Sequence, residues 1–113
     1  MSTITTHVLD LSRGLPARGM RVELEQKQDE KYFFISSRVT DNDGRIADLL
    51  SGESQLRSGI YRLRFYTGEY FSQLGTPALH PLVEIVFNAS DMRARYHIPL
   101  LITPHSYSTY RGS

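Results

Sequence analysis

The amino-acid sequence predicts an all-β domain: a two-sheet antiparallel sandwich of about eight strands with one short helix. Short runs of β-forming residues recur along the 113 residues, and several alternate apolar with polar side chains, which is typical of half-buried strands. Clusters of turn-forming residues, such as 14–19 and 41–44, separate these runs. Only one short segment has the length and composition for a couple of helical turns. Many short strands in one small chain favour an antiparallel sandwich.

The first strand is expected over residues 4–10. Ile4, Thr6 and Val8 would share one face of it and His7 the other, because successive side chains of a strand point to opposite sides. Further strands are expected over residues 20–26, 32–35, 60–66, 82–88, 95–102 and 107–111.

The connections between these strands also carry structural signals. The sequence DNDG at 41–44 predicts a turn. Residues 103–105 join the last two strands so closely that we expect a hairpin there. The short helix is expected over 69–74, directly before the Gly75–Pro77 break.

Two histidines fall on the outward faces of predicted strands. His7 lies opposite the apolar stripe of the first strand. In the strand over 95–102, His97 lies opposite Tyr96, Ile98 and Leu100. Both imidazoles are therefore expected where a ligand or another subunit has access.

Length and composition limit the classes of function. A chain of 113 residues forms one domain, which we expect to span residues 1–113. A formal net charge of +1 gives no field that would attract nucleic acid or an anionic membrane. The absence of cysteine excludes thiol nucleophiles, disulfides and cysteine-ligated zinc. No apolar run approaches the roughly 20 residues of a membrane span, and residues 1–5 lack the basic segment, apolar stretch and cleavage site expected of a signal peptide. A cytoplasmic location is expected.

Both ends of the chain resemble one enzyme family. Residues 5–10 (TTHVLD) with 14–17 (GLPA), and residues 96–113 (YHIPLLITPHSYSTYRGS), are similar to the N-terminal and C-terminal signatures of the 5-hydroxyisourate hydrolases. The final YRGS is the part that separates these enzymes from transthyretin, the hormone carrier with the same fold. Residues 44–45 and 59–61 also match, so the resemblance covers nearly the whole chain.

The resemblance implies a fold, an activity and an assembly. It implies a transthyretin-like (prealbumin, immunoglobulin-like) sandwich that assembles as a homotetramer, with active sites at the subunit interface. The implied reaction belongs to urate (purine) catabolism: the enzyme hydrolyses 5-hydroxyisourate to 2-oxo-4-hydroxy-4-carboxy-5-ureidoimidazoline. It is a cyclic amidase that acts on a C–N bond and needs no metal or organic cofactor.

The resemblance also implies which residues act. The catalytic residues it implies are His7, Arg45, His97 and Ser113, and the substrate-binding residues are His7, Arg45, Tyr110, Arg111 and Gly112.

These residue types suit the hydrolysis of a cyclic amide. Histidine titrates near neutral pH, so one imidazole can take a proton from water while the other protonates the leaving nitrogen. The sequence leaves open which histidine is the base. Arg45 stays charged and offers a donor fork for a carbonyl oxygen or a developing oxyanion. Ser113, the last residue of the sequence, would supply a hydroxyl and an α-carboxylate, and the Tyr110 ring would lie against a flat substrate.

Two other functions remain open from the residues alone. A transthyretin-like carrier would bind a small molecule without chemistry, but it has no need of an acid–base pair. An immunoglobulin-like interaction module has no need of two histidines and an arginine opposite its core, nor of this C-terminal sequence. A zinc site is not expected, because His7 and His97 lack a third ligand and Arg45 would repel the cation.

Overall fold

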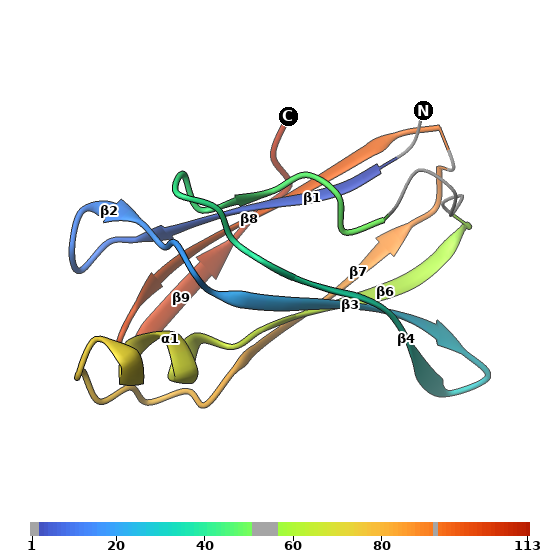
Figure 1. Ribbon diagram of the computed structural model, residues 1–113. Coiled ribbons are helices and arrows are strands. Elements are labelled where there is room, and N and C mark those ends of the chain that lie inside the picture. The colour runs from blue at the N-terminus through green and yellow to red at the C-terminus, as the bar shows by residue number, and fades with distance from the viewer. Residues whose placement is uncertain (1–2, 51–56, 92) are drawn as a thin grey trace.

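The computed structural model describes residues 3–50, 57–91 and 93–113. Two β-sheets face each other, and a short helix lies at one end of the sandwich (Figure 1). The elements in chain order are β1 (Thr3–Asp10), β2 (Leu15–Pro16), β3 (Arg21–Gln28), β4 (Lys31–Val39), β5 (Arg45–Ile46), β6 (Gly59–Phe65), α1 (Thr67–Gln73), β7 (Val83–Ala89), β8 (Arg95–Thr103) and β9 (Ser106–Thr109). The predicted all-β sandwich with one short helix is confirmed.

The strand order places the two ends of the sequence in the same sheet. The first sheet has the order β2-β1-β8-β9, and β5 also pairs with β1. The second sheet has the order β4-β3-β6-β7. The N-terminal strand therefore lies directly beside the strand that carries His97, as Figure 1 shows.

The core lies between the two sheets and follows the alternation of the strands. Along β1 every second residue is buried, and Ile4 and Val8 have no exposed surface. Leu63 of β6 and Leu100 of β8 are equally inaccessible to solvent. Burial of such side chains is the main favourable term in folding. The predicted inward faces are confirmed, and His7 and His97 lie on the opposite face, half-buried.

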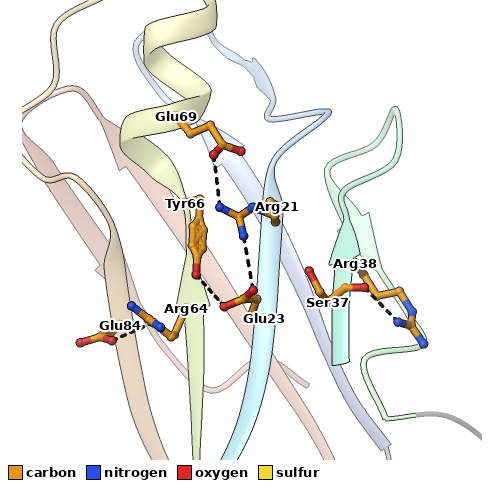
Figure 2. Close-up of polar contacts among 8 residues, drawn as sticks. All are labelled: Arg21, Glu23, Ser37, Arg38, Arg64, Tyr66, Glu69 and Glu84. Atoms are coloured by element: carbon orange, nitrogen blue, oxygen red, sulfur yellow. Dashed lines mark hydrogen bonds and ion pairs between the residues drawn. The ribbon is translucent and has the colours of Figure 1, made fainter. Parts of the chain in front are cut away.

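Ionic contacts link β3, β6, β7 and α1 on the outward side of the second sheet (Figure 2). The Arg21 guanidinium lies 3.3 Å from a carboxylate oxygen of Glu23 and 3.3 Å from one of Glu69. It also stacks 3.6 Å from the centroid of the Tyr66 ring, and the Tyr66 hydroxyl donates a 2.6 Å hydrogen bond to Glu23. The charges of Arg21, Glu23 and Glu69 therefore offset one another.

One strand pair differs from the antiparallel prediction. Within the described residues β1 and β8 run parallel, while the other strand pairs are antiparallel. A hairpin forces its two strands to run in opposite directions. Because the chain passes through the second sheet between β1 and β8, no hairpin fixes their relative direction.

Several element bounds also differ from the predicted ones. The two-residue strands β2 and β5 were not predicted, because two residues are too few to show a period. Strand β4 spans nine residues rather than 32–35, and a register shift beside Leu24 and Glu25 interrupts its alternation. Strand β9 ends at Thr109 rather than residue 111, because the tail then turns back to bridge His97. The predicted hairpin between the last two strands is confirmed.

Helix α1 begins two residues earlier than predicted, at Thr67, and buries Tyr70 and Phe71 against the core. Among the described residues, no helix has the length and apolar character to cross a membrane.

Candidate active site

Three strands of the first sheet bring the predicted polar residues together on its outward face. His7 on β1 is the register partner of Arg45 on the antiparallel β5. On the other side of β1, Thr5 is the register partner of His97 on the parallel β8. Residues i and i+2 of a strand share a face, so Thr5 and His7 point the same way. One strand therefore places His7 beside Arg45 and, two residues earlier, Thr5 beside His97.

The turn before β5 fixes the position of Arg45. One carboxylate oxygen of Asp41 accepts hydrogen bonds from the backbone N–H groups of Asp43 and Arg45, each over 2.9 Å. The hydrogen bond from the Arg45 backbone, supported by that from Asp43 and by electrostatic interactions with Arg45 and His7, holds the pKa of Asp41 below its usual value. Asp41 therefore stays ionised and keeps the turn closed at neutral pH.

Gly44 allows this turn to approach β1 closely. Its φ of +75° lies in the left-handed region, which favours glycine. A Cβ atom at this position would lie 2.3 Å from the carbonyl oxygen of Val8. The Val8 backbone N–H instead donates a 2.7 Å hydrogen bond to the Gly44 carbonyl. The predicted turn over 41–44 thus docks on the strand that carries His7.

The C-terminal tail folds back onto β8. The backbone N–H of Gly112 donates a 2.8 Å hydrogen bond to the carbonyl oxygen of His97, and the two residues form an isolated antiparallel bridge. The Arg111 guanidinium lies 4.6 Å from the centroid of the Tyr96 ring and donates a 3.4 Å hydrogen bond to the Arg95 carbonyl. These contacts place Ser113 beside the histidine.

A cavity of about 240 Å³ lies where these elements meet. Its walls come from β1, β5, β8 and the tail, and the lining residues are Thr5, Thr6, Arg45, Ile46, Ala47, Arg95, His97, Gly112 and Ser113. A volume of this order suits a small molecule with one or two rings. His7 is not among these lining residues; it lies beside them as the register partner of Arg45.

The His97 ring is held on two sides. The Thr5 hydroxyl oxygen lies 2.8 Å from Nδ1 of His97, at hydrogen-bonding distance. On the other side, a Cβ atom at Gly112 would lie 2.4 Å from Cδ2 of the same ring, so only glycine fits there without a shift. Partial burial, followed by electrostatic interactions with Arg45 and His7, lowers the pKa of His97 from its ordinary value of 6.5. The imidazole is therefore neutral at physiological pH.

The predicted site residues divide into two groups in the single chain. Arg45, His97, Gly112 and Ser113 line one cavity, and His7 adjoins it. Tyr110 and Arg111 do not line this cavity but a separate hollow of about 200 Å³ beside β7. Their predicted contact with the substrate stays a prediction.

Sequence reasoning did not single out Thr5 or Arg95 as site residues. The face assignment contained the signal, because Thr5 shares a strand face with His7 and Arg95 shares one with His97. Neither threonine nor arginine is a residue type that by itself indicates a functional site. Among the described residues, no group of three or more His, Cys, Asp or Glu is arranged to hold a metal ion.

Comparison with known proteins supplies the family. The model of the HIUase/Transthyretin family matches residues 4–112. The chain belongs to this family. A 5-hydroxyisourate hydrolase of Mus musculus is 40% identical over 114 residues, which cover 99% of this chain and 96% of the relative. One of Deinococcus radiodurans is 41% identical, with 97% of this chain and 95% of the relative covered.

Solved structures of the family agree with the fold. The 5-hydroxyisourate hydrolase of Klebsiella pneumoniae superposes with a TM-score of 0.87 at 36% identity, covering 100% of both chains. Sea bream transthyretin in complex with thyroxine superposes with a TM-score of 0.91 at 31% identity, covering 97% of this chain and 94% of that one. The family fold therefore occurs in a hydrolase and in a protein solved with bound thyroxine, so the fold alone does not separate catalysis from binding.

Proposed function

We propose that this member of the HIUase/Transthyretin family hydrolyses 5-hydroxyisourate in the cavity between β1, β5, β8 and the C-terminal tail. The observation that carries the proposal is the convergence of Arg45, His97 and Ser113 on one small cavity with His7 beside it. Relatives that are 40% and 41% identical over nearly the whole chain bear the name of this hydrolase. Two histidines can transfer the protons that amide hydrolysis requires, and Arg45 can stabilise the oxyanion.

In the proposed mechanism, His97 is the general base. Because its pKa lies below the usual value, the ring is neutral and has a lone pair for the proton of an attacking water. The oxygen of this water bonds to the amide carbon in the substrate's ring, and the carbonyl oxygen on that carbon becomes an oxyanion. Arg45 donates hydrogen bonds to that oxygen, where a charged donor stabilises the transition state.

The second half of the proposed reaction breaks the ring. The tetrahedral intermediate collapses, the C–N bond breaks, and the leaving nitrogen takes a proton from His7. Ser113, which lines the cavity beside His97, orients the substrate or the water with its hydroxyl group. No step needs a metal or an organic cofactor, because the two imidazoles and the guanidinium supply both proton transfer and charge stabilisation.

The assembly is also a proposal: four copies form a homotetramer with the sites at subunit interfaces. The cavity lies on the outward face of the first sheet, where a second copy would close it. The edge strands β7 and β9 carry exposed apolar side chains, with Val86 56% and Tyr107 43% accessible. Such patches are typical of interfaces. Light scattering after size exclusion is expected to give four chain masses, and a monomer at working concentration would contradict the assembly.

The domain organisation and the cellular location are also proposals. We propose that the chain is a single domain, which the family match over residues 4–112 supports. We also propose that the enzyme works in the cytoplasm. Cell fractionation with antibody detection tests the location, and recovery from the periplasm or the medium would contradict it.

Activity is tested with freshly made 5-hydroxyisourate, produced from urate by urate oxidase, while its absorbance decay is recorded. The wild-type chain is expected to accelerate the decay. Removal of a single transition-state donor or acid–base group costs on the order of 10²–10³ in rate. His97→Asn, His7→Asn and Arg45→Met are expected to fall in this range.

The matched control is His105→Asn, an exposed histidine in the turn between β8 and β9, which is expected to keep wild-type turnover. Wild-type rates in the His7 and His97 variants would refute the mechanism. A wild-type chain that binds the substrate without accelerating its decay would support the carrier function instead.

A further inference from the structure

The hydroxyl group of Thr5 contacts the candidate base at one ring nitrogen, Nδ1. Thr5 lies on β1 and His97 on β8, 92 residues apart in the sequence, and the parallel register aligns them. The Thr5 oxygen is 2.8 Å from Nδ1 of His97, a normal hydrogen-bonding distance.

The surroundings of the ring define which nitrogen is left for the substrate. Thr5 occupies the Nδ1 side, and Gly112 packs against the Cδ2 side so closely that no Cβ fits. The distal edge of the ring, with Nε2, is then the part available to the cavity that Arg45 and Ser113 also line.

A neutral imidazole carries its proton on one nitrogen only, and the partner of one nitrogen determines the state of the other. An acceptor at Nδ1 favours the Nδ1–H tautomer and leaves the Nε2 lone pair free to take a proton. The same acceptor also stabilises the imidazolium that forms, because both of its nitrogens are donors.

We propose that Thr5 is a positioning residue for the hydrolysis: its hydroxyl oxygen accepts a hydrogen bond from Nδ1–H of His97 and presents unprotonated Nε2 to the cavity. The inference rests on the proposed function, in which His97 is the base. Thr5 acts through His97 and takes no part in bond making.

The test replaces the hydroxyl without changing the shape of the strand. Thr5→Val keeps a β-branched side chain of nearly the same size but removes the acceptor. We expect kcat to fall roughly tenfold, the worth of one hydrogen bond, while KM stays near the wild-type value. The acid limb of the kcat/KM profile is expected to move to lower pH, because the imidazolium loses a partner.

Two variants serve as controls. Thr5→Ser retains the hydroxyl and is expected to restore both the rate and the pH profile. Thr3→Val makes the same chemical change two residues earlier on the same strand face, opposite Arg95 rather than His97, and is expected to leave both unchanged.

A spectroscopic measurement separates this inference from the proposed function. In ¹⁵N spectra of the histidine-labelled protein, Nδ1 of His97 is expected to carry the proton in the wild type and to lose it in part in Thr5→Val. A wild-type Nδ1 without a proton, or an unchanged acid limb in Thr5→Val, would overturn the role of Thr5. The outcome for the His97→Asn variant bears on the function alone.

Discussion

The backbone N–H of Gly112 donates a 2.8 Å hydrogen bond to the carbonyl oxygen of His97. This hydrogen bond ties the C-terminal tail to β8, the strand that carries the candidate base. The same glycine packs on the ring of that histidine, where a Cβ would lie 2.4 Å from Cδ2. Residue 112 thus controls where the imidazole points, although it has no side chain.

Gly112→Ala is therefore expected to impair catalysis more than stability. The added methyl group must displace the His97 ring, and a misplacement of about 1 Å can cost on the order of 10² in rate. The measurement is kcat beside the midpoint of thermal unfolding.

Gly75→Ala is the matched control for this substitution. A Cβ atom at Gly75 would have nothing within 4 Å, but the φ of this residue is +72°. The substitution is therefore expected to cost about 1 kcal/mol of stability and to leave turnover unchanged. Equal turnover in the two alanine variants would contradict the role given to Gly112.

Residues appended after Ser113 are expected to lower kcat/KM. Gly112 and Ser113 line the cavity, so any continuation of the chain has to leave from its wall and crowd the substrate. The same short Gly–Ser sequence inserted between Asp29 and Glu30, in the turn that joins β3 to β4, is the control. Absorbance decay of 5-hydroxyisourate compares the two, and a fully active C-terminal extension would speak against this placement of the tail.

Stability is expected to depend on pH through His97. Its folded-state pKa lies below 6.5, the value expected in the unfolded chain, chiefly because of partial burial. Above pH 6.5 the ring is neutral in both states and its contribution is complete. As the pH falls below 6.5, the unfolded chain binds the proton first, so the free energy of unfolding decreases until the folded-state pKa is passed.

Urea unfolding at a series of pH values measures this dependence. His97→Asn is expected to reduce the slope of the unfolding free energy against pH just below pH 6.5. The control, His105→Asn in the exposed turn, is expected to keep the wild-type slope in that range. An identical slope in wild type and His97→Asn would show that the folded ring titrates like an unfolded one.

Tyr70→Phe is expected to destabilise the fold without changing turnover per folded molecule. Asp10 is fully buried, and its Oδ2 accepts a 2.9 Å hydrogen bond from the Tyr70 hydroxyl. Removing that donor leaves a buried carboxylate oxygen short of a partner, which costs about 1–3 kcal/mol.

Chemical denaturation measures the loss, with Tyr107→Phe as the control. Tyr107 lies on β9 with 43% of its surface exposed, so its substitution is expected to change the free energy of unfolding very little. A Tyr70→Phe midpoint equal to wild type would contradict the structural weight given to this hydrogen bond.

The local pattern of the sequence was sufficient for the class of fold and for the faces of the strands. Alternation is a property of neighbouring residues, so it assigned Ile4 and Val8 to the core and His7 to the outside without knowledge of any partner strand. The same reasoning assigned His97. It missed β2 and β5, because a strand of two residues has no period to detect.

Only the tertiary structure decided which outward faces meet. The parallel pairing of β1 with β8 aligns Thr5 with His97, and the short β5 brings Arg45 beside His7. The tertiary structure also places Tyr110 outside the cavity that Ser113 lines. Strand partners and directions depend on contacts between segments far apart in the chain, and neither is encoded in the alternation of a single strand.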